Sequence, residues 1–396
     1  MPKKKLNFID LFSGCGGISL GLEEAGLNCL LGLDFLEPAI ETFKLNHKNS
    51  IGICADIQKT KTSEIKKLIK NQRVDLICGG PPCQGFSTVG LGKADDKRNH
   101  LFLDFVRFVR DFKPSYIMIE NVTGLLAKKN ENTLKSIYKE FQDLGYHLDI
   151  RVLTASHFGV PEVRRRVIIL GNNIGCQNFY PHKEFANYGE KARGLKSVRN
   201  VGWAFENLLS YRGKILNHDL DSAQIKKDID KKRIRCIPEG KYIRYERDEK
   251  EFLPKNLWFD HDWNAISENR FREAKYQRLD RKKPSPTILT SRHIYYHPTE
   301  DRYLTVREAA ALQSFPAKFQ FAGSLASQWT QVGNAVPPVM AKKIGEAILK
   351  TEANKKTKYK DAPIIDFESI RKYAFKYDKD THDHSAGLIE QLDLVI

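Results

Sequence analysis

The strongest constraint on this chain is an alternation, through about its first 170 residues, between short apolar runs and amphipathic segments. The spacing of apolar residues within the amphipathic segments predicts helices, and the runs rich in β-branched residues predict strands. Such an alternation favours an α/β fold with a mostly parallel, doubly wound sheet, whose strand ends form one ligand-binding edge. The expected strands are Leu6–Leu11, Cys29–Asp34, Val74–Cys78, Tyr116–Glu120 and Arg166–Leu170, and the expected helices are Pro38–Asn46, Ser63–Lys70, Leu101–Phe112 and Leu134–Leu144.

The alternation ends near Cys176, and a basic segment follows. From Cys176 to Lys283 the chain has 25 Lys+Arg against 17 Asp+Glu, half of its net charge of +16, together with three of its four Trp. Basic runs among aromatic residues predict a second domain that binds a charged polymer such as nucleic acid. A solvated face on an ordinary insertion explains the composition equally well. Beyond it, the pattern predicts helices at Thr305–Leu312 and Pro337–Leu349.

Cysteine spacing and hydropathy exclude several classes of protein. The seven Cys form no CxxC pair and no paired Cys/His cluster, so neither a zinc site nor a disulfide framework is expected. No apolar run approaches the roughly 18–20 residues of a membrane span. Reduced thiols and a chain without a signal peptide predict a cytoplasmic protein.

A glycine-rich turn follows the first expected strand, in the sequence FIDLFSGCGG ending at Gly17. Such a turn lets a ligand approach the backbone, and the helix behind it offers free N–H groups. Asp34 ends the next strand, where a carboxylate can bind ribose hydroxyls. Asp56 follows a third apolar run and can accept a hydrogen bond from an adenine amine. Taken singly, each Asp is more simply explained as a helix cap or a turn residue.

Three further motifs lie at expected strand ends or starts. Cys83 lies in GGPPCQGFS after the strand Val74–Cys78, where two prolines stiffen the chain, and is a candidate nucleophile. Glu120 of ENV ends its strand and can donate a proton if it is partly desolvated. In VRRRV, alternation places Arg164 and Arg166 on one face, suited to a phosphate or a polarised carbonyl oxygen. The alternatives are a buried thiol, a surface Glu and a solvated edge strand.

In combination these motifs resemble the C5-cytosine DNA methyltransferases. The resemblance covers about residues 6–175 and 278–350, and it rests on seven segments in the family's order. These are FIDLFSGCGG, GGPPCQGFS, ENV, VPEVRRR, RLDRKKPSPTILT, LTVREAAALQSFP and QVGNAVPP.

The resemblance implies a Rossmann-like domain that binds S-adenosylmethionine, releases S-adenosylhomocysteine and uses no metal. It implies that Cys83 attacks cytosine C6, that Glu120 contacts N3 and the exocyclic amine, and that Arg164 and Arg166 flank the base, with Arg166 on O2. The segment Gln84–Arg98 matches a mobile loop that closes over a flipped base. The implied cofactor residues are Phe12, Gly14, Gly16, Gly17, Asp34 (more often Glu in the family), Phe35, Asp56, Ile57, Pro82 and Asn334, and the implied DNA contacts are Ser87 and Arg98.

The resemblance also implies an organisation and partners. Residues 1–175 are expected to form the catalytic domain, 176–290 a smaller target-recognition domain, 291–352 a return to the catalytic domain and 353–396 a tail without an assigned role. The expected substrate is double-stranded DNA bound by a monomer. The expected role is that of the modification enzyme of a restriction-modification system, with a cognate endonuclease as a functional partner, or of an orphan methylase. If the enzyme is prokaryotic it is expected in the cytoplasm, and if it is viral it is expected in the host cell. The alternatives are a tRNA cytosine-5 methyltransferase and a catalytically silent DNA-binding protein.

Overall fold

A computed structural model describes residues 5–81, 100–191, 194–260, 262–263, 274–356 and 368. Two compact units divide the chain. The first contains residues 1–159, 164–197 and 335–396, and the second contains residues 160–163 and 198–334. Residues 176–197 therefore belong with the first unit, and residues 291–334 with the second.

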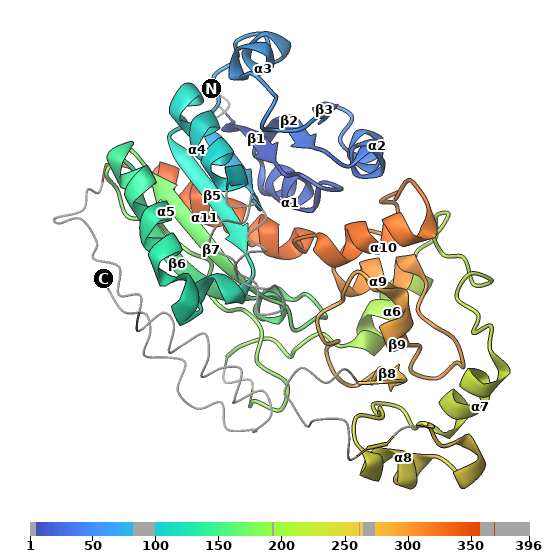
Figure 1. The fold of residues 1–396 in the computed structure, drawn as a ribbon. Helices are drawn as coiled ribbons and strands as arrows, with labels where there is room; N and C mark the ends of the chain where they lie inside the picture. The colour runs from blue at the N-terminus through green and yellow to red at the C-terminus, as the bar shows by residue number, and fades with distance from the viewer. Residues whose placement is uncertain are drawn as a thin grey trace. The chain divides into compact units, whose positions relative to one another are not determined.

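The first unit contains a seven-stranded sheet in the order β3-β2-β1-β4-β5-β7-β6 (Figure 1). All neighbouring pairs from β3 to β5 are parallel, whereas β7 runs antiparallel to both β5 and β6. The predicted α/β class with a mostly parallel sheet is therefore confirmed. The strands are β1 (Asn7–Leu11), β2 (Asn28–Asp34), β3 (Ile51–Cys54), β4 (Leu76–Gly79), β5 (Tyr116–Asn121), β6 (His147–Thr154) and β7 (Arg165–Asn172).

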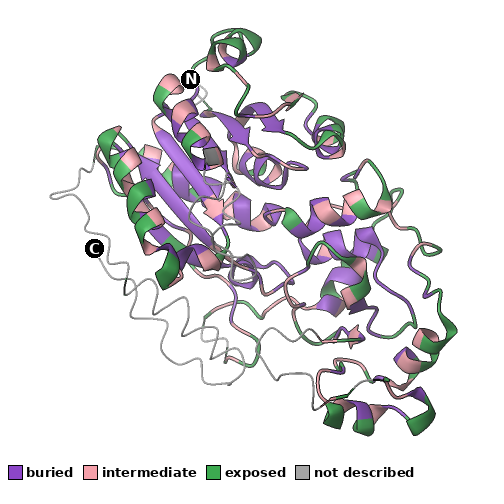
Figure 2. Cartoon of the chain, viewed as in Figure 1, coloured by how far each residue is buried: buried purple, intermediate pink, exposed green. Residues whose placement is uncertain are grey.

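Helices cover both faces of this sheet, and Figure 2 shows its central strands almost entirely buried. On one face, α1 packs closely against α11 because Gly21 and Gly345 have no side chains to separate the helices. The other face forms the large apolar core, to which α3, α4 and α5 contribute Ile65, Phe105 and Phe141. The helices are α1 (Gly17–Ala25), α2 (Glu37–Asn46), α3 (Thr62–Leu68), α4 (His100–Phe112), α5 (Glu131–Asp143) and α11 (Pro338–Ala353).

The second unit has short elements around an aromatic core. Ile234 and Ile243 pack there with Tyr276, Tyr296 and Tyr303. Its helices are α6 (Val201–Leu209), α7 (Asp228–Cys236), α8 (Glu246–Phe252), α9 (Val306–Leu312) and α10 (Leu325–Asn334), and its two short paired strands are β8 (Gln277–Arg278) and β9 (Tyr295–Tyr296).

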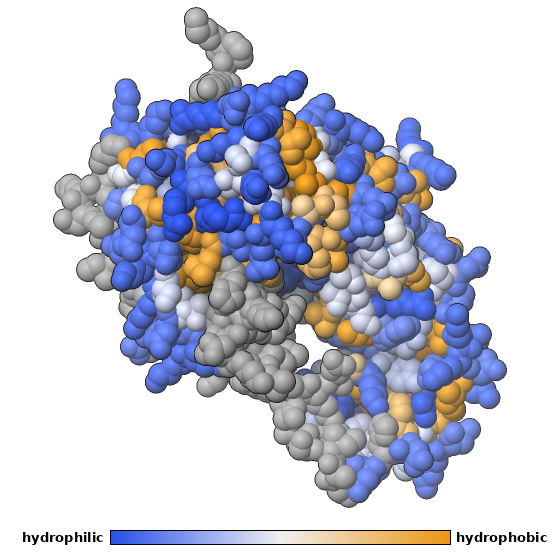
Figure 3. Space-filling view, turned by 45° about the horizontal axis from the view of Figure 1, so that its top comes forward, coloured by the Kyte–Doolittle hydropathy of each residue, from blue (hydrophilic) through white to orange (hydrophobic). Residues whose placement is uncertain are grey.

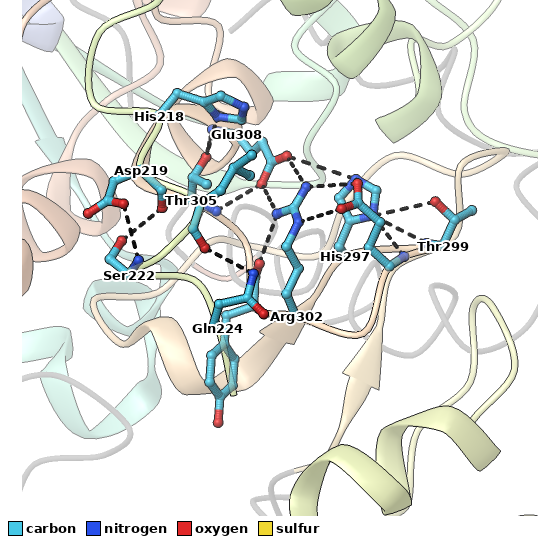
Figure 4. A network of polar contacts seen from close by, with 12 residues as sticks. His218, Asp219, Ser222, Gln224, His297, Thr299, Arg302, Thr305 and Glu308 are labelled. Atoms are coloured by element: carbon cyan, nitrogen blue, oxygen red, sulfur yellow. Dashed lines mark hydrogen bonds and ion pairs between the residues drawn. The ribbon is translucent and has the colours of Figure 1, made fainter. Parts of the chain in front are cut away.

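A buried polar network fixes the start of α9 in the second unit (Figure 4). The Arg302 guanidinium donates two hydrogen bonds of 2.8 Å to the Glu308 carboxylate. Glu308 also accepts from the Thr305 N–H at 2.8 Å, and the Thr305 hydroxyl in turn accepts from the Glu308 N–H. This capping box links the first turn of α9 to Arg302, and such reciprocal bonds satisfy helix N–H groups that would otherwise lack partners.

One face of the molecule is largely hydrophilic. On the face drawn in Figure 3, polar side chains predominate and apolar ones gather in small groups. In the described part of the chain, no helix is long and apolar enough to cross a membrane. Nor do three or more His, Cys, Asp or Glu side chains gather there as they would around a metal ion.

Candidate active site

The glycine-rich turn connects β1 to α1 in a tight, partly left-handed conformation. Phe12, Gly14 and Gly16 have φ values of 62°, 53° and 92°. A Cβ added to Gly16 would lie 2.3 Å from Nε2 of His47, so this position accepts only glycine without a shift. Phe12 packs against the main apolar core, and Gly17 begins α1. The turn is therefore held in one conformation by the packing around it.

Asp34 ties this turn to the end of β2. Its Oδ2 accepts from the Gly14 N–H at 2.8 Å and its Oδ1 from the Leu36 N–H at 2.9 Å. The residue is only 8% exposed, and burial raises the pKa of its carboxyl despite these hydrogen bonds. The neighbouring Phe35 is 67% exposed. The predicted carboxylate therefore lies at the turn, with an exposed aromatic ring beside it.

Asp56 lies at the same edge of the sheet as Asp34. The last pair in the β2–β3 register is Asp34 with Cys54, and the Ala55 N–H donates to the Asp34 carbonyl at 2.9 Å. The Asp56 carboxylate accepts from the Gln58 N–H at 3.0 Å. Ile57 is 3% exposed and belongs to the core. The structure thus brings Gly14, Asp34 and Asp56 to neighbouring strand ends, as the motifs predict.

Asp10, on β1 just before the turn, was missed by the sequence reasoning. It is fully buried, and its Oδ2 accepts from the Ser19 hydroxyl at 2.7 Å. Burial, together with the smaller effect of the Asp34 charge, raises the pKa of its carboxyl to about 7. One signal was available, because Asp10 is the only charged residue in the apolar run Phe8–Leu11.

Glu120 and Arg166 form an ion pair across β5 and β7. The Arg166 Nε lies 2.7 Å from the Glu120 Oε1, and the two side chains are only 13% and 12% exposed. The antiparallel register pairs Glu120 with Ile168, which places Arg166 two residues further on the same face. Gly80 makes room for the carboxylate, since a Cβ there would lie 2.9 Å from the Glu120 Oε2.

Asn121 anchors the chain that leads toward Cys83. It is buried, and its side-chain amide donates to the Pro81 carbonyl at 3.0 Å. The second residue of the ENV motif therefore connects the end of β5 to the loop after β4. Sequence reasoning assigned it no function, although its place beside Glu120 was visible.

Of the remaining predicted site residues, the structure places Arg164 and Asn334 and does not describe the others. Arg164 is 1% exposed and immediately precedes β7. Asn334 is an exposed residue at the end of α10, in the second unit. Four predicted residues lie outside the described part of the chain: Pro82, Cys83, Ser87 and Arg98.

Comparisons with known proteins identify the family of the chain. Residues 6–350 match the model of the C-5 cytosine-specific DNA methylase family. The chain is 36% identical to the Type II methyltransferase M1.HphI of Haemophilus parahaemolyticus, with 88% of each chain covered. It is 32% identical to the Type II methyltransferase M.DdeI of Desulfomicrobium norvegicum, over 87% of this chain and 88% of that one.

A solved structure has the same fold. It is that of a DNA modification methyltransferase encoded within an E. coli prophage, with a TM-score of 0.67 and 24% identity over 88% of this chain and all of that one. The sheet order, the family match over nearly the whole chain and the identity to Type II enzymes lead to one conclusion. The chain belongs to the C-5 cytosine-specific DNA methylase family and is a DNA (cytosine-5-)-methyltransferase.

Proposed function

We propose that this enzyme methylates cytosine C5 within one short sequence of double-stranded DNA, with S-adenosylmethionine as methyl donor. The observation that carries the proposal is the nearly buried Glu120–Arg166 ion pair, at the strand edge where the loop toward Cys83 begins. A carboxyl and a guanidinium held together in this way suit N3 and O2 of a cytosine ring.

The turn after β1 fits a cationic nucleoside better than a phosphate. Two N–H donors that could have bound an anion are already taken, since the Asp34 carboxylate accepts from Gly14 and that of Asp10 accepts from Ser19. The buried Asp10 Oδ1 and Ser13 Oγ have no hydrogen-bond partner among the described residues. Buried polar atoms usually have partners, so a bound ligand would complete this site.

The roles of the other cofactor residues are those that the resemblance implies. Asp34 would hold the ribose, Asp56 the adenine amine, and Phe35 offers an exposed ring for the adenine face. Pro82 and Asn334 rest on their motifs alone. When bound, S-adenosylmethionine supplies an electrophilic methyl group.

The protein's own residues make cytosine reactive toward that group. Cytosine C5 is a weak nucleophile, and addition of the Cys83 thiolate to C6 converts the ring to an enamine that is nucleophilic at C5. Glu120 stabilises this change at N3 and Arg166 stabilises negative charge at O2, while Arg164 supports the position of the strand. Loss of the C5 proton, to water or hydroxide, then expels Cys83. The base must leave the duplex for C6 to be reached, with Ser87 and Arg98 in the closing loop.

The second unit is suited to reading DNA. Exposed basic side chains lie on α7 and just before it, at Lys226, Lys227, Lys232 and Arg235. The Arg199 guanidinium lies 4.1 Å from the ring centroid of Trp203, which is itself 37% exposed. Basic groups of this kind bind phosphates, and side chains from the same region would contact base edges. This is the support for a target-recognition role within residues 176–290.

The Type II relatives support a role in restriction-modification, with a cognate endonuclease that cuts the same sequence when it is unmodified. No contact between the two enzymes is required for this, and a monomer on DNA suffices.

The test is transfer of tritium from methyl-labelled S-adenosylmethionine to plasmid DNA or to tRNA. The native enzyme should label DNA, and Cys83→Ser should label nothing while still binding the cofactor. Cys236→Ser is the matched control, because that thiol donates to the carbonyl of Lys232 within its own helix and lies in none of the catalytic motifs, and it should retain activity. Labelling of tRNA alone would refute the DNA assignment, and appreciable turnover by Cys83→Ser would refute the nucleophile.

A further inference from the structure

The turn after β1 is flanked by two buried carboxylates, and the described residues place no balancing cation beside them. Asp10 and Asp34 are both at least nine-tenths buried, and the charge of Asp34 raises the pKa of Asp10. In the described part of the chain, no Lys, Arg or His forms an ion pair or hydrogen bond with either carboxylate. Buried charges are normally paired, so this turn favours a ligand that brings a positive charge.

Asp10 is closely packed on every side. From β1 it faces Ser19 at the start of α1, the Cys78 thiol on β4 and the Cys29 thiol on β2. Burial raises the pKa of both thiols, so they stay neutral near pH 7. Beyond Gly16, the His47 ring is paired with Glu23 at 2.6 Å. Neutral neighbours screen a charge poorly, so the field of Asp10 reaches further than it would in water.

We propose that Asp10 makes the cofactor site distinguish the positively charged methyl donor from its neutral product, an inference that rests on the proposed function. S-adenosylmethionine carries a sulfonium charge. When the methyl group leaves, sulfur keeps the bonding electron pair and S-adenosylhomocysteine is a neutral thioether. The Asp10 carboxylate stabilises the first and not the second, so it favours entry of the donor and departure of the product.

In this role Asp10 is a specificity-determining residue that acts through its charge. Asp34 contributes to the same field, but it also holds Gly14 and is assigned to the ribose, so its replacement would disturb both ligands alike. Asp10 is the cleaner probe because Asp10→Asn has the same shape and keeps an oxygen that can accept from Ser19.

The experiment measures dissociation constants by calorimetry at pH 8 for three ligands. These are S-adenosylmethionine, S-adenosylhomocysteine and sinefungin, whose amine places a positive charge near the position of the sulfonium. Asp10→Asn should weaken both cationic ligands about tenfold, which corresponds to about 1.4 kcal/mol, and the neutral product less than about twofold. Glu24→Gln, which removes the same charge from the exposed side of α1, should change none of them.

The ratio between ligands separates charge from structure. Equal weakening of all three ligands by Asp10→Asn would show a merely structural role and overturn the inference. Failure of the native enzyme to bind either S-adenosyl ligand would instead overturn the proposed function.

A second measurement needs no variant. In the native enzyme, acidification from pH 8 to pH 6 protonates Asp10 and should weaken the donor relative to the product by about threefold or more. A ratio that does not change with pH would also overturn the inference.

Discussion

Removing Arg166 should destabilise the first unit and abolish most activity, and both effects have their origin in one ion pair. The Arg166 Nε and Glu120 Oε1 are 2.7 Å apart, and about seven-eighths of each side chain is buried. Two unit charges about 4 Å apart at an effective dielectric constant of about 20 attract by roughly 4 kcal/mol. Residual exposure and solvent screening reduce this, so we expect a coupling energy of about 2 kcal/mol.

The assay is a double-mutant cycle of Arg166→Met, Glu120→Gln and the double variant, followed by urea unfolding. Each single variant leaves one buried group without its partner and should lose about 2–3 kcal/mol. The double variant should lose clearly less than the sum of the two. Single-turnover rates on DNA should fall by about 100-fold or more in each variant, because both groups stabilise charge on the base. Additive stability losses, with a coupling energy below about 0.5 kcal/mol, would refute this account of the pair.

Two other substitutions test the packing of the first unit. Gly16→Ala should lower the free energy of unfolding by about 2 kcal/mol more than Gly26→Ala does, and it should weaken cofactor binding. Both positions have a left-handed φ, but only the Cβ at position 16 would clash with His47. Equal losses of stability in thermal unfolding would contradict this. Burial lowers the pKa of His157 to about 4, so the folded state resists a proton that the unfolded chain accepts near pH 6.5. The stability that His157 contributes is therefore complete above about pH 6.5 and is lost as pH falls toward 4. We expect the free energy of unfolding to fall by about 2 kcal/mol between pH 7.5 and pH 5 from this cause. His157→Gln should remove that part of the pH dependence of the urea midpoint.

The sequence predicted the centre of the sheet well, because strands buried on both faces are continuous apolar runs. All five expected strands are present as β1, β2, β4, β5 and β7, within one or two residues. β6 was missed because its alternating sequence HLDIRVLT includes Asp149 and Arg151, which are compatible with a partly exposed edge strand. The antiparallel direction of β7 was also not predicted, since direction depends on how the chain returns to the sheet and not on the strand's own residues.

The sequence predicted the positions of those site residues that their motifs place at a strand end. Asp34, Asp56, Glu120 and Arg166 lie at or beside the strand ends where the motifs place them. Asp10 and the link from Asn121 to Pro81 were not predicted, because both depend on side-chain contacts between segments distant in sequence. A polar residue within a buried strand is the signal that would have identified Asp10.

The most direct test of the central claim is bisulfite sequencing of plasmid DNA from a host that lacks its own cytosine methylation and expresses the enzyme. The account predicts protected cytosines within one short consensus sequence for the native enzyme, and none for Cys83→Ser. A plasmid left fully unprotected by folded native enzyme, or protected equally in the Cys83→Ser strain, would contradict it.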